Sequence, residues 1–184
     1  MRVIAGSAKG TRLGPVPRGV RPVSDRVREG LFSSLGDAVE SARVLDVFAG
    51  TGALGIEALS RGAAHARFVD RSSASIRAIR ENLRRTRLED RATVAHGEAL
   101  AMLMDDDKSS GPVYDLVLAD PPYEHPLEAV SATLAALAGG RLRSGGTCVL
   151  TRATRSSTPV IPLHWGVSRR LEYGDTAVLI LREA

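Results

Sequence analysis

The sequence predicts an α/β fold built on a doubly wound, Rossmann-like sheet that is mostly parallel and ends in an antiparallel hairpin. Three observations support this fold class. From residue 43 onward, short apolar runs alternate with segments of helical periodicity. A glycine-rich turn follows the first apolar run, and beyond Pro162 two strand-like runs follow each other directly. The chain has 184 residues, of which 43% are hydrophobic, and this is enough to form the core of one domain of this kind.

A small β-hairpin is expected to precede the sheet. Short strand-like runs at residues 2–5 and 11–13 flank a turn that contains glycines, and three prolines then favour an extended linker. We therefore predict a basic hairpin and linker at residues 1–22 and one sheet domain at residues 23–184. A helix should begin near Ser24, which is a good N-cap residue, and Asp25 adds a favourable first-turn charge.

The sheet domain follows a regular order of strands and helices. Strands are predicted near residues 43–48, 66–70, 91–95, 114–119 and 146–151, and helices near 53–61, 73–87, 97–104 and 126–138. The runs 167–171 and 177–181, joined around residues 173–176, predict the terminal hairpin. Ligands bind beyond the carboxyl ends of strands in such sheets, so the turns that follow the strands are where a site is expected.

The turn after the first strand has the glycine spacing of a nucleotide-type cofactor loop. Gly50, Gly52 and Gly55 allow positive φ and close approach of a ligand to the backbone. The same spacing matches the dinucleotide fingerprint, with Asp70 in the position of a ribose-binding acid. Asp46 distinguishes between a dinucleotide and S-adenosylmethionine as the cofactor, because a carboxylate repels a pyrophosphate but attracts the ammonium and sulfonium of S-adenosylmethionine. We therefore favour the methyl donor.

Acidic residues follow three successive strands. Asp46 would face the cofactor's ammonium, Asp70 its ribose hydroxyls and Glu98 its adenine amino group. The alternative for Asp70 is a turn or N-cap acid, and for Glu98 a first-turn helix acid. The predicted cofactor-binding residues are Asp46, Phe48, Gly50, Thr51, Gly52, Asp70, Arg71, Glu98 and Ala99.

The run Asp120-Pro121-Pro122-Tyr123 follows an apolar strand and has the composition of an amino-methylation site. The lone pair of a nucleobase amine is delocalised into the ring, so an enzyme must localise it before methylation. Asp120 and the Pro121 carbonyl would each accept one N–H, and the prolines would hold that geometry rigid. Tyr123 offers a ring face for an extruded base. The alternative is a simple strand-ending turn.

Basic charge is concentrated at the front of the chain. Residues 1–30 hold seven basic and two acidic side chains, whereas the whole chain has a net charge of +4. Such a segment suits a phosphate backbone, although arginine-rich composition or a solvated face would give the same pattern.

Other functional classes receive no support from composition. No stretch has the length of a signal peptide's apolar segment or of a membrane span, so we expect a cytoplasmic protein. Cys148 is the single cysteine and should pack as an apolar side chain. The four histidines lack metal-ligand spacing, so no metal is expected, and a monomer is the default.

Over nearly its whole length the sequence resembles the class I methyltransferases that modify a guanine N2 in small-subunit ribosomal RNA, the RsmD type. The resemblance rests on residues 2–6 with 10–13, the run 21–29, the loop 46–55, residues 120–123 and the tail 173–176. Val23 stands where this family commonly has threonine.

The resemblance implies methyl transfer from S-adenosylmethionine to the N2 amine of one guanine, with the assembled small ribosomal subunit as the expected substrate. Asp120 and Pro121 would orient the amine, Pro122 would set the loop and Tyr123 would stack on the flipped base. Phosphate contacts are expected from Arg2, Lys9, Arg12, Arg21 and Arg26.

Four alternatives remain open at this stage. An adenine-N6 methylase acting on DNA or RNA would use the same Asp-Pro-Pro-Tyr run, because any planar exocyclic amine fits it. A glutamine side-chain methylase would usually carry an asparagine in place of Asp120. A dinucleotide-dependent oxidoreductase conflicts with Asp46, and a non-catalytic ribosome assembly factor would not need an intact cofactor loop.

Overall fold

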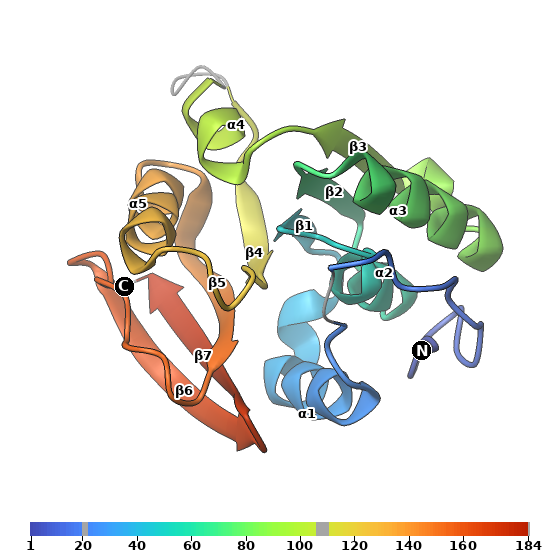
Figure 1. The fold of residues 1–184 in the computed structure, drawn as a ribbon, viewed down its shortest axis with the longest axis horizontal. Helices are drawn as coiled ribbons and strands as arrows, with labels where there is room; N and C mark the ends of the chain where they lie inside the picture. The colour runs from blue at the N-terminus through green and yellow to red at the C-terminus, as the bar shows by residue number, and fades with distance from the viewer. Residues whose placement is uncertain (20–21, 106–110, 184) are drawn as a thin grey trace.

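The fold is organised by a seven-stranded sheet with the strand order β3-β2-β1-β4-β5-β7-β6 (Figure 1). The structure is a computed structural model that describes residues 1–19, 22–105 and 111–183. The strands are β1 (Arg43–Val47), β2 (His65–Asp70), β3 (Ala92–His96), β4 (Tyr114–Ala119), β5 (Leu142–Ala153), β6 (Trp165–Tyr173) and β7 (Thr176–Glu183).

Pairing within the sheet is parallel from β3 to β5 and antiparallel from β5 to β6. The chain runs outward from β1 through β2 to β3 and then returns to place β4 on the other side of β1. The switch point therefore lies between β1 and β4, where ligands bind in open sheets of this type. The predicted fold class, including the antiparallel C-terminal hairpin, is confirmed.

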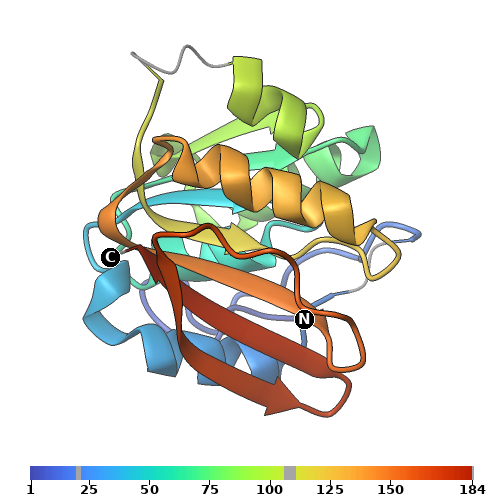
Figure 2. The same ribbon diagram turned by 90° about the vertical axis from the view of Figure 1, so that its left-hand side faces the viewer.

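Helices cover both faces of the sheet (Figure 2). They are α1 (Asp25–Leu35), α2 (Ala53–Ser60), α3 (Ser73–Thr86), α4 (Ala99–Asp105) and α5 (Leu127–Ala138), with 3-10 turns η1 (Gly36–Val39) and η2 (Glu89–Arg91). No helix in the described ranges has the length and apolarity needed to cross a bilayer.

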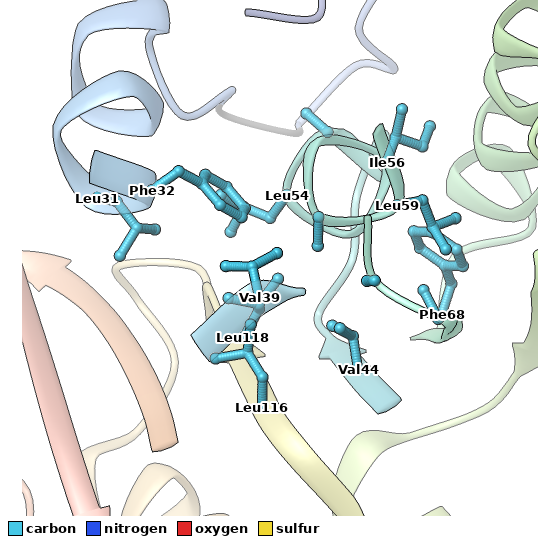
Figure 3. Close-up of a cluster of buried hydrophobic side chains, with 14 of the residues drawn as sticks. Leu31, Phe32, Val39, Val44, Leu54, Ile56, Leu59, Phe68, Leu116 and Leu118 are labelled. Atoms are coloured by element: carbon cyan, nitrogen blue, oxygen red, sulfur yellow. The ribbon is translucent and has the colours of Figure 1, made fainter. Parts of the chain in front are cut away.

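Two apolar clusters fill the space between the sheet and its helices. Side chains of α1 and α2 pack in the first cluster with alternate strand residues such as Val44 and Leu116 (Figure 3). Side chains of α3 belong to the same cluster. Side chains of α4 and α5 pack in the second with the intervening strand residues, such as Leu45 and Val117. This alternation follows from the period of two in a strand, and it buries both faces of the sheet.

Helix α1 begins where the sequence predicts. Ser24 is its N-cap, and the Ser24 hydroxyl accepts a hydrogen bond from the Val27 N–H at 3.3 Å. Strand β5 is longer than predicted, because its pairing with β4 extends back to Leu142 through an irregular register.

The predicted N-terminal hairpin is reduced to one isolated antiparallel bridge, between Arg2 and Arg12. Longer strands do not form because the N–H groups of Ile4 and Ala5 donate instead to the carboxylate of Glu57, at 2.8 and 3.0 Å. Val3, Ala8 and Leu13 are buried in the same cluster as α1 and α2. The segment is thus packed on the sheet domain, and the division at residue 22 stays a prediction.

Candidate active site

A cavity of about 540 Å³ lies beyond the carboxyl ends of β1, β2 and β4. Its walls come from the turns that follow these strands, and from two segments that are distant in sequence. Residues 18–19 and 22–24 approach it from the segment before α1, and residues 173 and 175–176 approach it from the turn between β6 and β7. The volume lies within the range of small-molecule and cofactor sites.

The turn after β1 has a backbone conformation that only a few residue types tolerate. Gly50 and Gly52 have φ of 57° and 75°, which favours glycine at both positions. Gly55 is required for close packing, because a Cβ there would lie 2.4 Å from Cε1 of Phe68 on β2. The glycine spacing therefore serves both the loop conformation and the close packing of α2 on the sheet.

Phe48 is strained, with φ of 62° in a region that a bulky side chain seldom adopts. Strain of this kind concentrates at functional sites. The Phe48 ring meets the His125 ring edge-on at 5.1 Å between centroids, and both residues line the cavity. Burial of the His125 ring, together with the nearby Arg71, lowers the pKa of His125.

Asp46 lies at the base of the cavity and is 1% exposed. Its Oδ2 accepts the Gly55 N–H at 2.9 Å. Burial raises the pKa of this carboxyl well above the ordinary aspartate range; the Gly55 hydrogen bond opposes that shift, while the charges of Asp120 and Asp70 add to it. A buried acid surrounded by other acids favours a cationic ligand, because a nearby positive charge stabilises its ionised form.

Asp70 accepts hydrogen bonds from two backbone groups. The Gly50 N–H donates to Oδ2 and the Ser72 N–H to Oδ1, both at 2.8 Å. Each oxygen keeps a second lone pair, so a ligand hydroxyl could still bind there. The N-cap of α3 is Ser72 rather than Asp70.

Glu98 and Arg71 form an ion pair at 3.2 Å at the cavity wall, with side chains that are 52% and 64% exposed. Ala99 is buried beside them at the start of α4. Of the predicted cofactor residues, the structure brings Asp46, Phe48, Gly50, Thr51, Asp70, Arg71, Glu98 and Ala99 to the cavity wall. Gly52 is placed behind that wall, against Ile79 and Phe68.

Asp120 follows β4 directly and is held from the neighbouring strand. The hydroxyl of Thr151 on β5 donates a hydrogen bond to Asp120 Oδ1. The register pairs Ala119 with Leu150, which sets Thr151 beside Asp120. Sequence reasoning missed Thr151, because nothing in the local pattern indicates which strand lies next to β4.

Tyr123 is joined to the start of β7, where Thr176 Oγ1 lies 3.0 Å from the tyrosine hydroxyl. The Pro122 carbonyl accepts the His125 N–H at 2.9 Å and closes the loop. The four predicted catalytic residues, Asp120, Pro121, Pro122 and Tyr123, all line the cavity together with Asp46. Arg18, Asp175 and Thr176 also line it and were missed as site residues, although the turn at 173–176 was recognised as a sequence feature.

Only some of the basic side chains in residues 1–30 are exposed to solvent. Arg2, Lys9, Arg12 and Arg26 are exposed, and Arg2 lies 3.8 Å from Asp25. Arg21 lies outside the described residues. Arg28 is fully buried instead, with its guanidinium 2.6 Å from Asp25 and 3.4 Å from Glu57.

The Cys148 thiol has no visible part in chemistry. Burial raises the pKa of the Cys148 thiol to about 12, which leaves it un-ionised and unreactive at neutral pH. Within the described ranges, no group of three or more His, Cys, Asp or Glu side chains is placed to hold a metal ion.

A sheet of this strand order, with a glycine loop after β1 and Asp-Pro-Pro-Tyr after β4 in one cavity, defines a class I methyltransferase, the class that uses S-adenosylmethionine. Its family is equally clear from comparison with known proteins. The chain belongs to the family described as Conserved hypothetical protein 95, the RsmD family, whose model matches residues 1–182.

Individual relatives agree with this assignment. The chain is 35% identical to ribosomal RNA small subunit methyltransferase D of Escherichia coli, over 100% of this chain and 91% of that protein. It is 42% identical to a putative rRNA methyltransferase of Bacillus subtilis, YlbH, over 67% of each chain. Among solved structures, the putative methyltransferase yhhF from Escherichia coli superposes with a TM-score of 0.86 at 34% identity, covering 100% of this chain and 97% of that one.

Proposed function

We propose that this protein transfers a methyl group from S-adenosylmethionine to the exocyclic N2 amine of a guanine in small-subunit ribosomal RNA. One observation carries the proposal: Asp120, held by Thr151, lines the same cavity as the buried acid Asp46. One carboxylate is suited to an amine and the other to a cationic cofactor. The names of two relatives, ribosomal RNA small subunit methyltransferase D and putative rRNA methyltransferase YlbH, support RNA as the substrate class.

The acids at the strand ends would hold the cofactor. Asp46 would bind the ammonium group, which compensates the cost of its burial. Asp70, already fixed by two backbone N–H groups, would accept from the ribose hydroxyls, and Glu98 would accept from the adenine amine. The remaining wall is formed by Phe48, Gly50, Thr51, Arg71 and Ala99, with Gly52 shaping the turn. When bound, the cofactor supplies an electrophilic methyl group on its sulfonium.

The residues after β4 would prepare the amine. Asp120 and the Pro121 carbonyl would accept its two N–H groups, which localises the nitrogen lone pair toward the methyl group. The hydrogen bond from Thr151 keeps the Asp120 carboxylate in one orientation before substrate arrives. The amine becomes acidic once it is alkylated, so proton loss needs no strong general base.

Tyr123 would stack on the guanine after the base leaves its helix. Its hydroxyl is held by Thr176, so the ring is fixed in the cavity wall. Base stacking on an aromatic side chain contributes about 1–3 kcal/mol, which helps to offset the cost of extruding the base.

Basic residues of the N-terminal segment would contact RNA phosphates. Arg2, Lys9, Arg12 and Arg26 are exposed, and Arg21 belongs to the same proposal although it lies outside the described residues. Such contacts position RNA without reading its sequence. The assembled small subunit as substrate, a cytoplasmic location and a monomeric state stay predictions.

The proposal is tested by incubating the purified protein with methyl-labelled S-adenosylmethionine and small ribosomal subunits from cells that lack the protein. Nucleoside analysis of the RNA should place the label in N2-methylguanosine. Label in N6-methyladenosine would instead assign an adenine methylase with the same site. Cofactor binding without any RNA methylation would reject the RNA substrate, and no cofactor binding would favour a non-catalytic assembly factor.

A further inference from the structure

Asn82, in the C-terminal half of α3, bridges two segments that are far apart in the sequence. Its Oδ1 accepts the Gly14 N–H at 2.7 Å, and its Nδ2 donates to the Thr51 carbonyl at 2.9 Å. Gly14 lies two residues after the N-terminal bridge between Arg2 and Arg12, whereas Thr51 lies in the glycine loop and lines the cavity. Asn82 is 1% exposed and Thr51 is 4% exposed, so water does not compete for the bridge between them.

The chemistry of the bridge requires a carboxamide. Gly14 presents a donor and Thr51 an acceptor, so one side chain must accept at one end and donate at the other. A buried donor or acceptor left without a partner is destabilising. Aspartate could satisfy Gly14 but would set a second oxygen against the Thr51 carbonyl, and leucine would satisfy neither group.

A second contact binds the same N-terminal segment to the other helix that follows a cofactor turn. Glu57 on α2 accepts the N–H groups of Ile4 and Ala5. Helix α2 begins directly after Gly52, and α3 begins directly after the Asp70 turn. Figure 1 shows the N-terminal trace running beside both helices. The segment that carries Arg2, Lys9 and Arg12 is therefore bound to the scaffold of the cofactor loop.

We propose that Asn82 is a positioning residue that couples the RNA-contacting segment to the methyl-donor loop, so that RNA and cofactor each strengthen the binding of the other. The RNA side of this inference rests on the proposed function. RNA that immobilises residues 1–14 would hold Gly14 against Asn82, and Asn82 would then hold the Thr51 carbonyl. The loop would bind the cofactor with less ordering cost, and linkage makes the effect reciprocal.

The coupling is measured as the dissociation constant of S-adenosylhomocysteine, with and without saturating unmethylated small ribosomal subunits. RNA should tighten binding by the unaltered protein by about fivefold or more, in the range of ordinary allosteric coupling. Asn82→Asp and Asn82→Leu should reduce that factor to about one. A factor of one in the unaltered protein, or an unchanged factor in both variants, would overturn the proposal.

The matched control is Thr86→Val, one turn further along α3. Thr86 is also buried, but its hydroxyl donates only to carbonyls of its own helix, those of Asn82 and Leu83. This variant should lose stability yet keep the RNA effect on cofactor affinity. If Thr86→Val also lost the RNA effect on cofactor affinity, that effect would depend on the general stability of α3. The proposal would then be wrong.

A second readout needs no RNA. Saturating S-adenosylhomocysteine should slow hydrogen exchange in residues 8–14 of the unaltered protein but not of Asn82→Asp. Gly14→Pro, which removes the donor at the other end of the bridge, should abolish slowing in the rest of the segment. Equal slowing in all three proteins would reject the coupling. Slowing that depends on Asn82, in a protein that does not methylate RNA, would keep the coupling and reject the substrate assignment.

Discussion

The hydroxyl of Tyr123 lies 3.0 Å from Oγ1 of Thr176, and this contact joins the loop after β4 to the first residue of β7. Three elements of the chain, α5, β5 and β6, lie between the two residues. The C-terminal hairpin therefore contributes directly to the cavity wall. Its turn holds the aromatic ring that would receive the target base.

Removing this contact should affect substrate handling more than folding. Tyr123→Phe keeps the ring, so kcat/KM should fall only about threefold to tenfold, as for loss of one ordinary hydrogen bond. Tyr123→Ala also removes the stacking surface and should cost a further factor of about ten or more. Steady-state kinetics with unmethylated small subunits measures both effects, and Thr176→Val should match Tyr123→Phe. Equal activity of Tyr123→Ala and the unaltered protein would reject the stacking role.

Asp120 should be essential for turnover but not for cofactor binding. Asp120→Ala removes one of the two acceptors proposed for the amine, and turnover should fall by about a hundredfold or more, by analogy with loss of one oriented transition-state partner. Asp120→Asn keeps an acceptor oxygen and should retain more activity than Asp120→Ala. Single-turnover methyl transfer and calorimetric binding of S-adenosylhomocysteine separate the two quantities.

Asp115→Asn is the matched control, because Asp115 lies on β4 near its opposite end and accepts the Arg43 N–H. Its turnover should be close to normal. If Asp120→Ala also retained near-normal turnover, the amine-orienting role would be wrong.

The raised pKa of Asp46 predicts opposite effects on stability and on binding. Burial is its main cause, so the ligand-free fold favours the protonated acid. The stability that protonation contributes is complete below the ordinary aspartate pKa and is lost as pH rises through the raised pKa. Asp46→Asn should therefore raise the melting temperature of the ligand-free protein on the alkaline side of that transition, and change it little in acid.

Cofactor binding should respond in the other direction. The cofactor's ammonium favours ionised Asp46, so affinity for S-adenosylhomocysteine should increase as pH rises through this titration, with release of a proton. Asp46→Asn should bind more weakly and lose that pH dependence. Calorimetry in buffers of different ionisation enthalpy measures the proton release, and a pH-independent affinity in the unaltered protein would contradict the prediction.

Glu57 should be the most stability-sensitive charge in the described structure. It is fully buried and accepts from the backbone of Ile4 and Ala5 and from the side chains of Arg28 and Arg61. Glu57→Ala leaves buried Arg28 without this partner and should cost about 3–5 kcal/mol. Thermal unfolding should show a fall in melting temperature on the order of 10 °C.

Adding Arg28→Met to Glu57→Ala should cost less than the sum of the two single changes, because no unpaired charge is then left inside. Glu81→Ala breaks exposed ion pairs with Arg84 and Arg85 and should change the melting temperature little. A Glu57→Ala protein as stable as Glu81→Ala would show that the buried network has no net role in stability.

Most of the fold was predictable from local pattern. The alternation of strands and helices was correct, and so was the start of α1 at Ser24. The N-terminal hairpin was reduced to one bridge because its donors bind Glu57, a residue more than fifty positions away. Contact with the distant Glu57 also explains why Arg28, which was counted among the basic residues of the N-terminal segment, is buried in the interior.

The candidate site likewise contains residues that the sequence could predict and residues that it could not. The wall around the cavity contains Asp46, Gly50, Asp70 and Asp120, each of which lies near the carboxyl end of a strand or in the turn that follows it. Their residue types and positions along the chain were enough to group them, since parallel strands present their carboxyl ends at one edge of a sheet. Thr151, Thr176 and Asn82 could not be found this way, because they belong to elements whose neighbours are set by strand order.

The sequence alone therefore determined the fold class, the glycine loop, and the acids and prolines placed at the ends of strands. These depend on φ and ψ preferences, on periodicity and on residue chemistry over a few positions. Only the tertiary structure decided that Thr151 holds Asp120, that Thr176 holds Tyr123 and that Asn82 joins Gly14 to Thr51. Those pairs depend on which strands lie side by side and in what register, and burial of both faces of the whole sheet sets that arrangement.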